Sequence, residues 1–117
     1  MISDSAQYKI LNKLHVSDSK NLIIFSSSGN DGEWIDDLLG KEVFLFDNDT
    51  PIWQIDAPKG SRHIFDESEN KFVDEPYEWN FCSIYKKDEK YLAERFDGYV
   101  FELDMQTGKA TYLYWTK

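Results

Sequence analysis

The sequence predicts an all-β fold, mainly antiparallel, and two observations support this prediction. Apolar and polar residues alternate with a period of two over several stretches, as they do in strands with one buried face. Turn residues separate these stretches, most clearly Asp97-Gly98, a pair typical of two-residue type I′ turns. We expect about seven or eight strands in two packed sheets or one strongly curled sheet, with at most one or two short helices.

The N-terminal half contains two predicted hairpins. The first has a turn at residues 17–20, and a short amphipathic helix over residues 6–14 is the alternative for its opening strand. Residues 33–39 suit one helical turn that ends at Gly40. The expected strands of this half cover residues 8–16, 22–27, 43–46 and 52–56.

The C-terminal third predicts an antiparallel meander, because four alternating stretches follow one another with short turns between them. In its last hairpin we expect Phe101 and Leu103 to point inward and Asp104 to cap the following turn. Gly108 would adopt the left-handed conformation that closes the loop. The expected strands cover residues 79–86, 91–96, 99–104 and 110–116.

This last hairpin also resembles part of a known repeat. The run Gly98-Tyr-Val-Phe-Glu-Leu-Asp-Met-Gln-Thr-Gly-Lys, followed by Trp115, is similar to one outer hairpin of the quinoprotein-type β-propeller repeat, and residues 40–53 echo it more weakly. A propeller needs four or more four-stranded blades, which 117 residues cannot supply. The resemblance therefore implies a hairpin and no quinone.

Length and composition indicate a single domain, residues 1–117, that folds by itself. Hydrophobic residues make up 41% and aromatic residues 16% of the chain, which argues against disorder. No apolar run approaches the length of a membrane span, and the N-terminus is unlike a secretory signal. With one cysteine and so no internal disulfide, we expect a cytoplasmic protein, either a monomer or a weak dimer.

The net charge of −9, from 13 basic and 22 acidic residues, restricts the choice of partner. A negative field repels phosphate backbones and anionic lipids, so we expect neither nucleic acid nor a membrane as partner. The same field attracts basic proteins and accelerates their encounter. The alternative is that the acidity serves solubility alone.

Sites for metal ions and catalysis are not apparent. Asp47-Asn48-Asp49 resembles the start of a calcium loop, but Ile52 occupies the glycine position and Pro58 the glutamate position, so we expect a solvated turn. Two histidines and one cysteine, Cys82, give no convincing zinc set. We expect Cys82 to pack in the core, and we expect no metal, no cofactor and no enzymatic activity.

Residues 65–79 differ from the rest because six acids and one base lie among four aromatic residues without a clear period. Acids steer a basic partner and aromatic anchors form a desolvated centre, so this segment suits a protein-binding surface. The alternative is a solvated loop whose aromatic residues fold under into the core. The candidate partner-binding residues are Asp66, Glu67, Glu69, Asp74, Glu75, Tyr77, Glu78 and Trp79, together with a second group, Asp31, Glu33, Trp34, Asp36 and Asp37.

On this acidic and aromatic run and the charge of −9, the chain resembles the bacterial immunity proteins of contact-dependent growth inhibition and related toxin systems. The resemblance implies that it binds and neutralises a basic cognate toxin domain, commonly a nuclease. A small-molecule-binding β-domain, with aromatic residues lining a pocket, and an accessory subunit of another complex are the alternatives.

Overall fold

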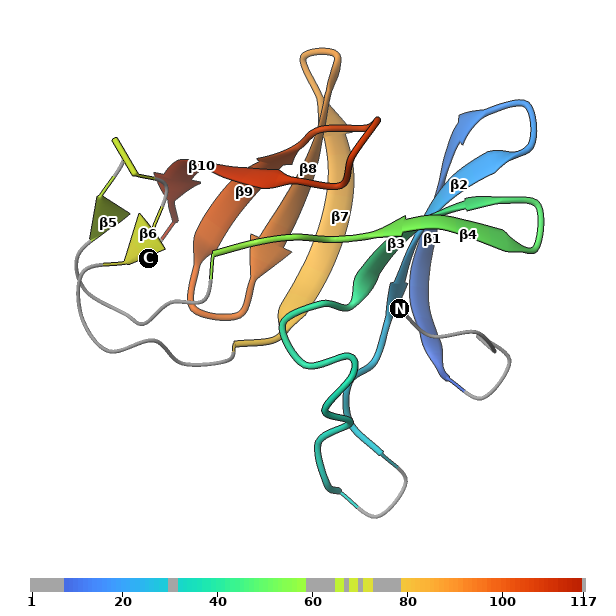
Figure 1. Ribbon diagram of the computed structural model, residues 1–117, viewed down its shortest axis with the longest axis horizontal. Helices are drawn as coiled ribbons and strands as arrows, with labels where there is room; N and C mark the ends of the chain where they lie inside the picture. The colour runs from blue at the N-terminus through green and yellow to red at the C-terminus, as the bar shows by residue number, and fades with distance from the viewer. Residues whose placement is uncertain are drawn as a thin grey trace.

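Two four-stranded antiparallel sheets form most of the described part of the molecule, which confirms the predicted all-β class (Figure 1). The computed structural model describes residues 8–29, 32–58, 65–66, 68–69, 71–72 and 79–116. Over these ranges there is no helix, and thus none long and apolar enough to cross a bilayer.

Each sheet is a meander in which every strand pairs with its neighbour in sequence. The N-terminal sheet consists of β1 (Ile10–Ser17), β2 (Lys20–Phe25), β3 (Val43–Asp47) and β4 (Thr50–Gln54). The C-terminal sheet consists of β7 (Phe81–Lys87), β8 (Lys90–Arg95), β9 (Tyr99–Leu103) and β10 (Ala110–Trp115). Between them in sequence, β5 (Phe65–Asp66) and β6 (Lys71–Phe72) form a separate two-stranded pair.

The predicted strands are found within a few residues of their expected bounds. The helical alternative for residues 6–14 is wrong over its described part, because β1 pairs with β2 along its length. In residues 33–39 only one turn of helical geometry forms, in which the Leu39 amide donates to the Ile35 carbonyl at 2.9 Å. The hairpins that echo the propeller repeat, β3–β4 and β9–β10, occupy the third and fourth strand positions of the two sheets.

The turn at Asp97-Gly98 differs from the predicted two-residue type I′ turn. Gly98 has a φ of +94°, but Asp97 does not have a positive φ. The amide of Gly98 donates to the carbonyl of Arg95 at 2.9 Å, so the connection is a three-residue loop with a left-handed glycine at its end. The type I′ geometry occurs instead in the β7–β8 turn, where Asp88 and Glu89 have φ values of 52° and 65°.

The main hydrophobic core lies between the two sheets, and β7 packs against β1 and β2. A smaller core lies on the other face of the N-terminal sheet, where Phe25, Phe44 and Phe46 pack around the buried Leu38. Covering on both faces explains why β2 and β3 carry continuous apolar runs rather than alternation. Phe101 and Leu103 point into the main core, as predicted.

One joint between the sheets is formed by Trp53 of β4. Its indole N–H donates to the Met105 carbonyl at 2.9 Å, and its ring lies against Gly108 in the β9–β10 loop. Next to this contact, Asp56 and Lys109 form an isolated parallel bridge. As predicted, Gly108 is left-handed, with a φ of +83°, and the side chain of Asp104 caps the loop by accepting from the Gln106 amide at 2.9 Å.

The prediction that Cys82 packs in the core is wrong, because this residue is exposed. The register of β7 against β8 shifts between Phe81 and Ser83, which places a β-bulge at Cys82. The bulge changes the phase of the alternation, so that Phe81 and Ile84 enter the core while Cys82 stays outside.

Candidate functional site

The Trp34 loop, defined as residues 32–40, lies against the outer face of the N-terminal sheet. It contains all of the second predicted group except Asp31. Two side chains anchor it: Leu38 is completely buried, and Ile35 packs against the smaller core. The Ile35 amide also donates to the carbonyl of Ser27 at 2.7 Å. The loop is therefore held by these two apolar residues, and the residues on either side of Ile35 face outward.

The outward residues of this loop combine an aromatic ring with carboxylates. Trp34 is 55% exposed, and Glu33, Asp36 and Asp37 are exposed as well. The loop contains no lysine or arginine. An anchored loop loses little backbone freedom on binding, and an exposed tryptophan on such a loop suits an interface anchor.

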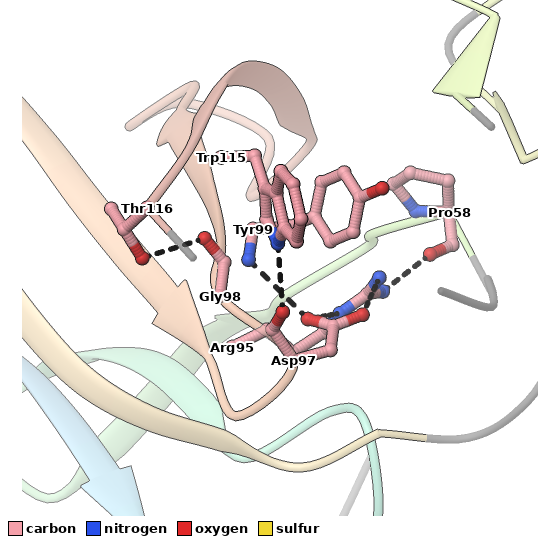
Figure 2. Close-up of polar contacts among 7 residues, drawn as sticks. All are labelled: Pro58, Arg95, Asp97, Gly98, Tyr99, Trp115 and Thr116. Atoms are coloured by element: carbon pink, nitrogen blue, oxygen red, sulfur yellow. Dashed lines mark hydrogen bonds and ion pairs between the residues drawn. The ribbon is translucent and has the colours of Figure 1, made fainter. Parts of the chain in front are cut away.

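The acidic segment of residues 65–79 is part of an insertion between the sheets, and both ends of this insertion are fixed at the same place. The guanidinium of Arg95 donates from Nη1 to the Pro58 carbonyl at 2.8 Å (Figure 2). The amide of the next residue, Phe96, donates to the Asn80 carbonyl at 2.8 Å. Residues 58 and 80 are thus bound to two consecutive residues at the end of β8.

The Arg95 side chain that binds Pro58 is also part of a buried ion pair. Its Nε and Nη2 donate to the two carboxylate oxygens of Asp97 at 3.1 and 2.9 Å, and both side chains are only 3% exposed. The guanidinium lies over the ring of Phe101, 5.0 Å from its centroid. The indole N–H of Trp115 also binds Asp97, donating to its backbone carbonyl at 3.1 Å (Figure 2). This bidentate geometry satisfies a charge pair that would be expensive to bury otherwise.

Trp79, the last of the predicted segment, stacks on Phe96, with ring centroids 6.3 Å apart and an interplanar angle of 17°. Phe96 is 56% exposed. The indole Nε1 of Trp79 is buried and has no hydrogen-bond partner among the described residues. A stacked aromatic pair with one exposed ring therefore marks the point where the insertion rejoins the C-terminal sheet.

Glu42 connects the Trp34 loop to this point, although it is itself completely buried. One carboxylate oxygen accepts from the Phe81 amide at 3.0 Å, and the other accepts from the Gly40 amide at 3.2 Å. Burial raises the pKa of Glu42 above its ordinary value, while hydrogen bonds from Ser27 and from the two amides act in the opposite direction. Glu42 thus joins the end of the Trp34 loop to the start of β7.

The predicted site residues differ in where the structure places them. The exposed side chains are Glu33, Trp34, Asp36, Asp37 and Glu69, while Trp79 is half-buried. Asp66 has its backbone in β5. The residues that lie outside the described ranges are Asp31, Glu67, Asp74, Glu75, Tyr77 and Glu78.

Two residues of this site, Phe96 and Glu42, are not among the sequence predictions. A phenylalanine directly before Asp-Gly, at a position that ends a strand, was the available signal for Phe96. Glu42 offered no signal, because it is one of 22 acidic residues and nothing in its neighbourhood distinguishes it from a surface carboxylate.

The structure also locates features that relate to metal and small-molecule binding. Asp47 accepts a hydrogen bond from the Ser19 hydroxyl and ends β3 at its turn. Among the described residues, no three histidines, cysteines or acids are grouped as metal ligands. A shallow groove of about 240 Å³ lies on the C-terminal sheet, lined by Lys87, Asp88, Lys90, Leu92, Leu113 and Tyr114.

No family model matches this chain, and comparisons with the curated proteins and with the solved structures give no match. The functional argument therefore depends on the chain's own residues.

Proposed function

We propose that this protein is an immunity-type inhibitor that binds and neutralises a basic toxin domain of the bacterial cell in which it resides. The observation that supports this proposal best is the Trp34 loop. It presents an indole that is 55% exposed between exposed carboxylates, on a backbone fixed by the buried Leu38. The protein itself performs no reaction in this proposal, and it needs neither metal nor cofactor.

The charge of the chain supports the same function. A net charge of −9 accelerates the encounter with a basic protein and disfavours acidic competitors. If the toxin is a nuclease, its active site is cationic because it binds phosphates. Carboxylates of the inhibitor would then occupy the groove that the substrate phosphates use.

The test is protection of cells from the toxin domain encoded by the neighbouring upstream gene. We expect co-expression of this chain to restore growth, and we expect the two purified proteins to form a complex. Replacing Glu33, Asp36 and Asp37 with lysine should abolish both. The matched control makes the same change in charge at exposed acids of other segments, Asp49, Asp56 and Glu89, and should retain most of the protection.

Two results would contradict the proposal. If no toxin domain from the gene neighbourhood binds the chain or is neutralised by it, the immunity function is wrong. If the loop variant and its control lose protection equally, the acidic residues act through the overall electrostatic field of the protein rather than through the Trp34 loop.

The insertion needs its own test, because it carries the first group of predicted residues. Replacing Asp66, Glu67, Asp74 and Glu75 with lysine reverses the charge of residues 65–79. We expect weaker protection, with the free energy of unfolding unchanged because both ends of the insertion are fixed by Arg95 and Phe96. Full protection by a folded variant would remove this segment from the interface.

A further inference from the structure

The Trp34 loop and the Trp79–Phe96 pair come from different sheets, yet they meet at one residue. The amide of Gly40, which ends the loop, and the amide of Phe81, two residues after Trp79, donate to the two oxygens of the Glu42 carboxylate. This carboxylate is completely buried. The two exposed aromatic positions are therefore fixed to a common internal support.

The sizes of the molecule and of protein interfaces allow one partner to contact both features. A standard interface covers about 800 Å² on each partner, which corresponds to a patch roughly 30 Å across. The described molecule measures 38 × 37 × 21 Å. A patch of this width spans most of the longest dimension of the molecule, so one partner is large enough to contact both segments.

We infer that the Trp34 loop and the Trp79–Phe96 pair form one composite docking surface, and that its occupant is an arginine-bearing segment of a basic protein. This inference rests on the proposed function and specifies the partner's chemistry. It depends on charge complementarity, since the exposed acids Glu33, Asp36 and Asp37 flank Trp34 without a base in the loop.

Arginine fits this surface better than lysine. Its planar guanidinium stacks on an aromatic face and simultaneously donates in a fork to a carboxylate. Trp34 presents the face and its neighbours present the carboxylates. At the second position, Phe96 presents an exposed ring. Trp79 lies beneath it, with an indole N–H that has no acceptor among the described residues, so its signal should respond when a partner presses on the stack.

The experiment titrates the full, isotope-labelled chain with a short peptide of alternating glycine and arginine at physiological ionic strength. The indole N–H signals are assigned by single Trp→Phe variants and followed by NMR. We expect the signals of Trp34 and Trp79 to shift with the same midpoint. The signal of Trp53, which is 6% exposed and bonded to Met105, should stay in place. A lysine version of the peptide should bind severalfold more weakly.

Substitutions complete the test. Trp34→Ala and Phe96→Ala should each raise the midpoint by about tenfold, as truncation of an interface anchor does. Ile52→Ala, at a residue 45% exposed on β4, should change it by less than about twofold, because scattered surface contacts contribute little. An unchanged Trp53 signal shows that each variant remains folded.

Several outcomes would overturn the inference. A shift of only one of the two signals, different midpoints for the two, or no shift at all would show that they do not form one surface. Equal binding of the lysine peptide would refute the preference for arginine. The cell-protection assay is independent of this peptide. If the chain gives no protection but both NMR signals still shift, the proposed toxin-neutralising function is wrong and the composite docking surface stands.

Discussion

The joint between Trp53 and Gly108 allows a quantitative test of how the two sheets are held together. A methyl group added at Gly108 would lie 2.6 Å from Cε3 and 2.7 Å from Cδ2 of Trp53. The indole cannot easily move away, because it is 6% exposed and its N–H is bonded to the Met105 carbonyl. Gly108→Ala must therefore either strain the backbone or break this joint.

The magnitude follows from two contributions. A φ of +83° costs a residue with a Cβ about 1–2 kcal/mol, and overpacking a closed site costs about 1–3 kcal/mol more. We expect Gly108→Ala to lower the free energy of unfolding by about 2–5 kcal/mol, a large part of the 5–15 kcal/mol typical of small proteins.

Gly32 provides the matched control, because its φ is also +83° but no described residue lies within 4 Å of an added Cβ. Gly32→Ala should cost only the backbone contribution of about 1–2 kcal/mol. Urea unfolding followed by tryptophan fluorescence measures both variants. Combining Gly108→Ala with Trp53→Leu should cost less than the sum of the single changes. Equal destabilisation by the two alanine variants would refute the described joint.

Three further predictions concern buried charge and the exposed thiol. The folded-state pKa of Glu42 lies above its ordinary value of 4.5, so the contribution of this residue to stability should be greatest below that value and fall as pH rises through the folded-state pKa; Glu42→Gln should remove this part of the pH dependence of urea unfolding. Asp97→Ala leaves the guanidinium of Arg95 buried without its partner and should lower the free energy of unfolding by about 3–5 kcal/mol in the same assay. A loss below about 1 kcal/mol, which is typical of surface ion pairs, would contradict the burial of this pair. Because Cys82 is exposed, a thiol reagent should modify it fully in the native protein. If the thiol reacts only after unfolding, Cys82 is buried and the described bulge is wrong.

The strands could be predicted from the sequence because their signals are local. Alternation in β7 to β10 and the turns at Asp88 and Gly98 depend on residues close in sequence, and strand bounds differ from the predictions by only a few residues. Two of the errors, at Cys82 and at the Asp97-Gly98 turn, each come from one extra residue in a hairpin. At Cys82 a bulge changes which side chains face inward, and a bulge is determined by packing across strands rather than by the local pattern.

The candidate site was predictable only in part, for a different physical reason. Residue types marked the Trp34 loop correctly as acidic and aromatic, and its acids are indeed exposed. The role of Glu42 depends on the approach of Phe81, which is 39 positions away in sequence. No pattern within a window of the chain encodes such a contact, so a buried carboxylate looks like the exposed carboxylates around it.

The arrangement of the joints suggests why a small protein can carry a long insertion between its two sheets. Trp53 and Gly108 join the sheets at one place, and Glu42 and Phe81 join them at another. Both joints are formed by described residues that lie outside the insertion. Arg95 and Phe96 then bring residues 58 and 80 together. The C-terminal sheet therefore holds the two ends of the insertion close to each other and offsets the entropic cost of closing this loop. Segments that connect sheets tolerate substitution better than the strands they join, so this insertion is a place where the charge and aromatic residues that a partner requires can be selected.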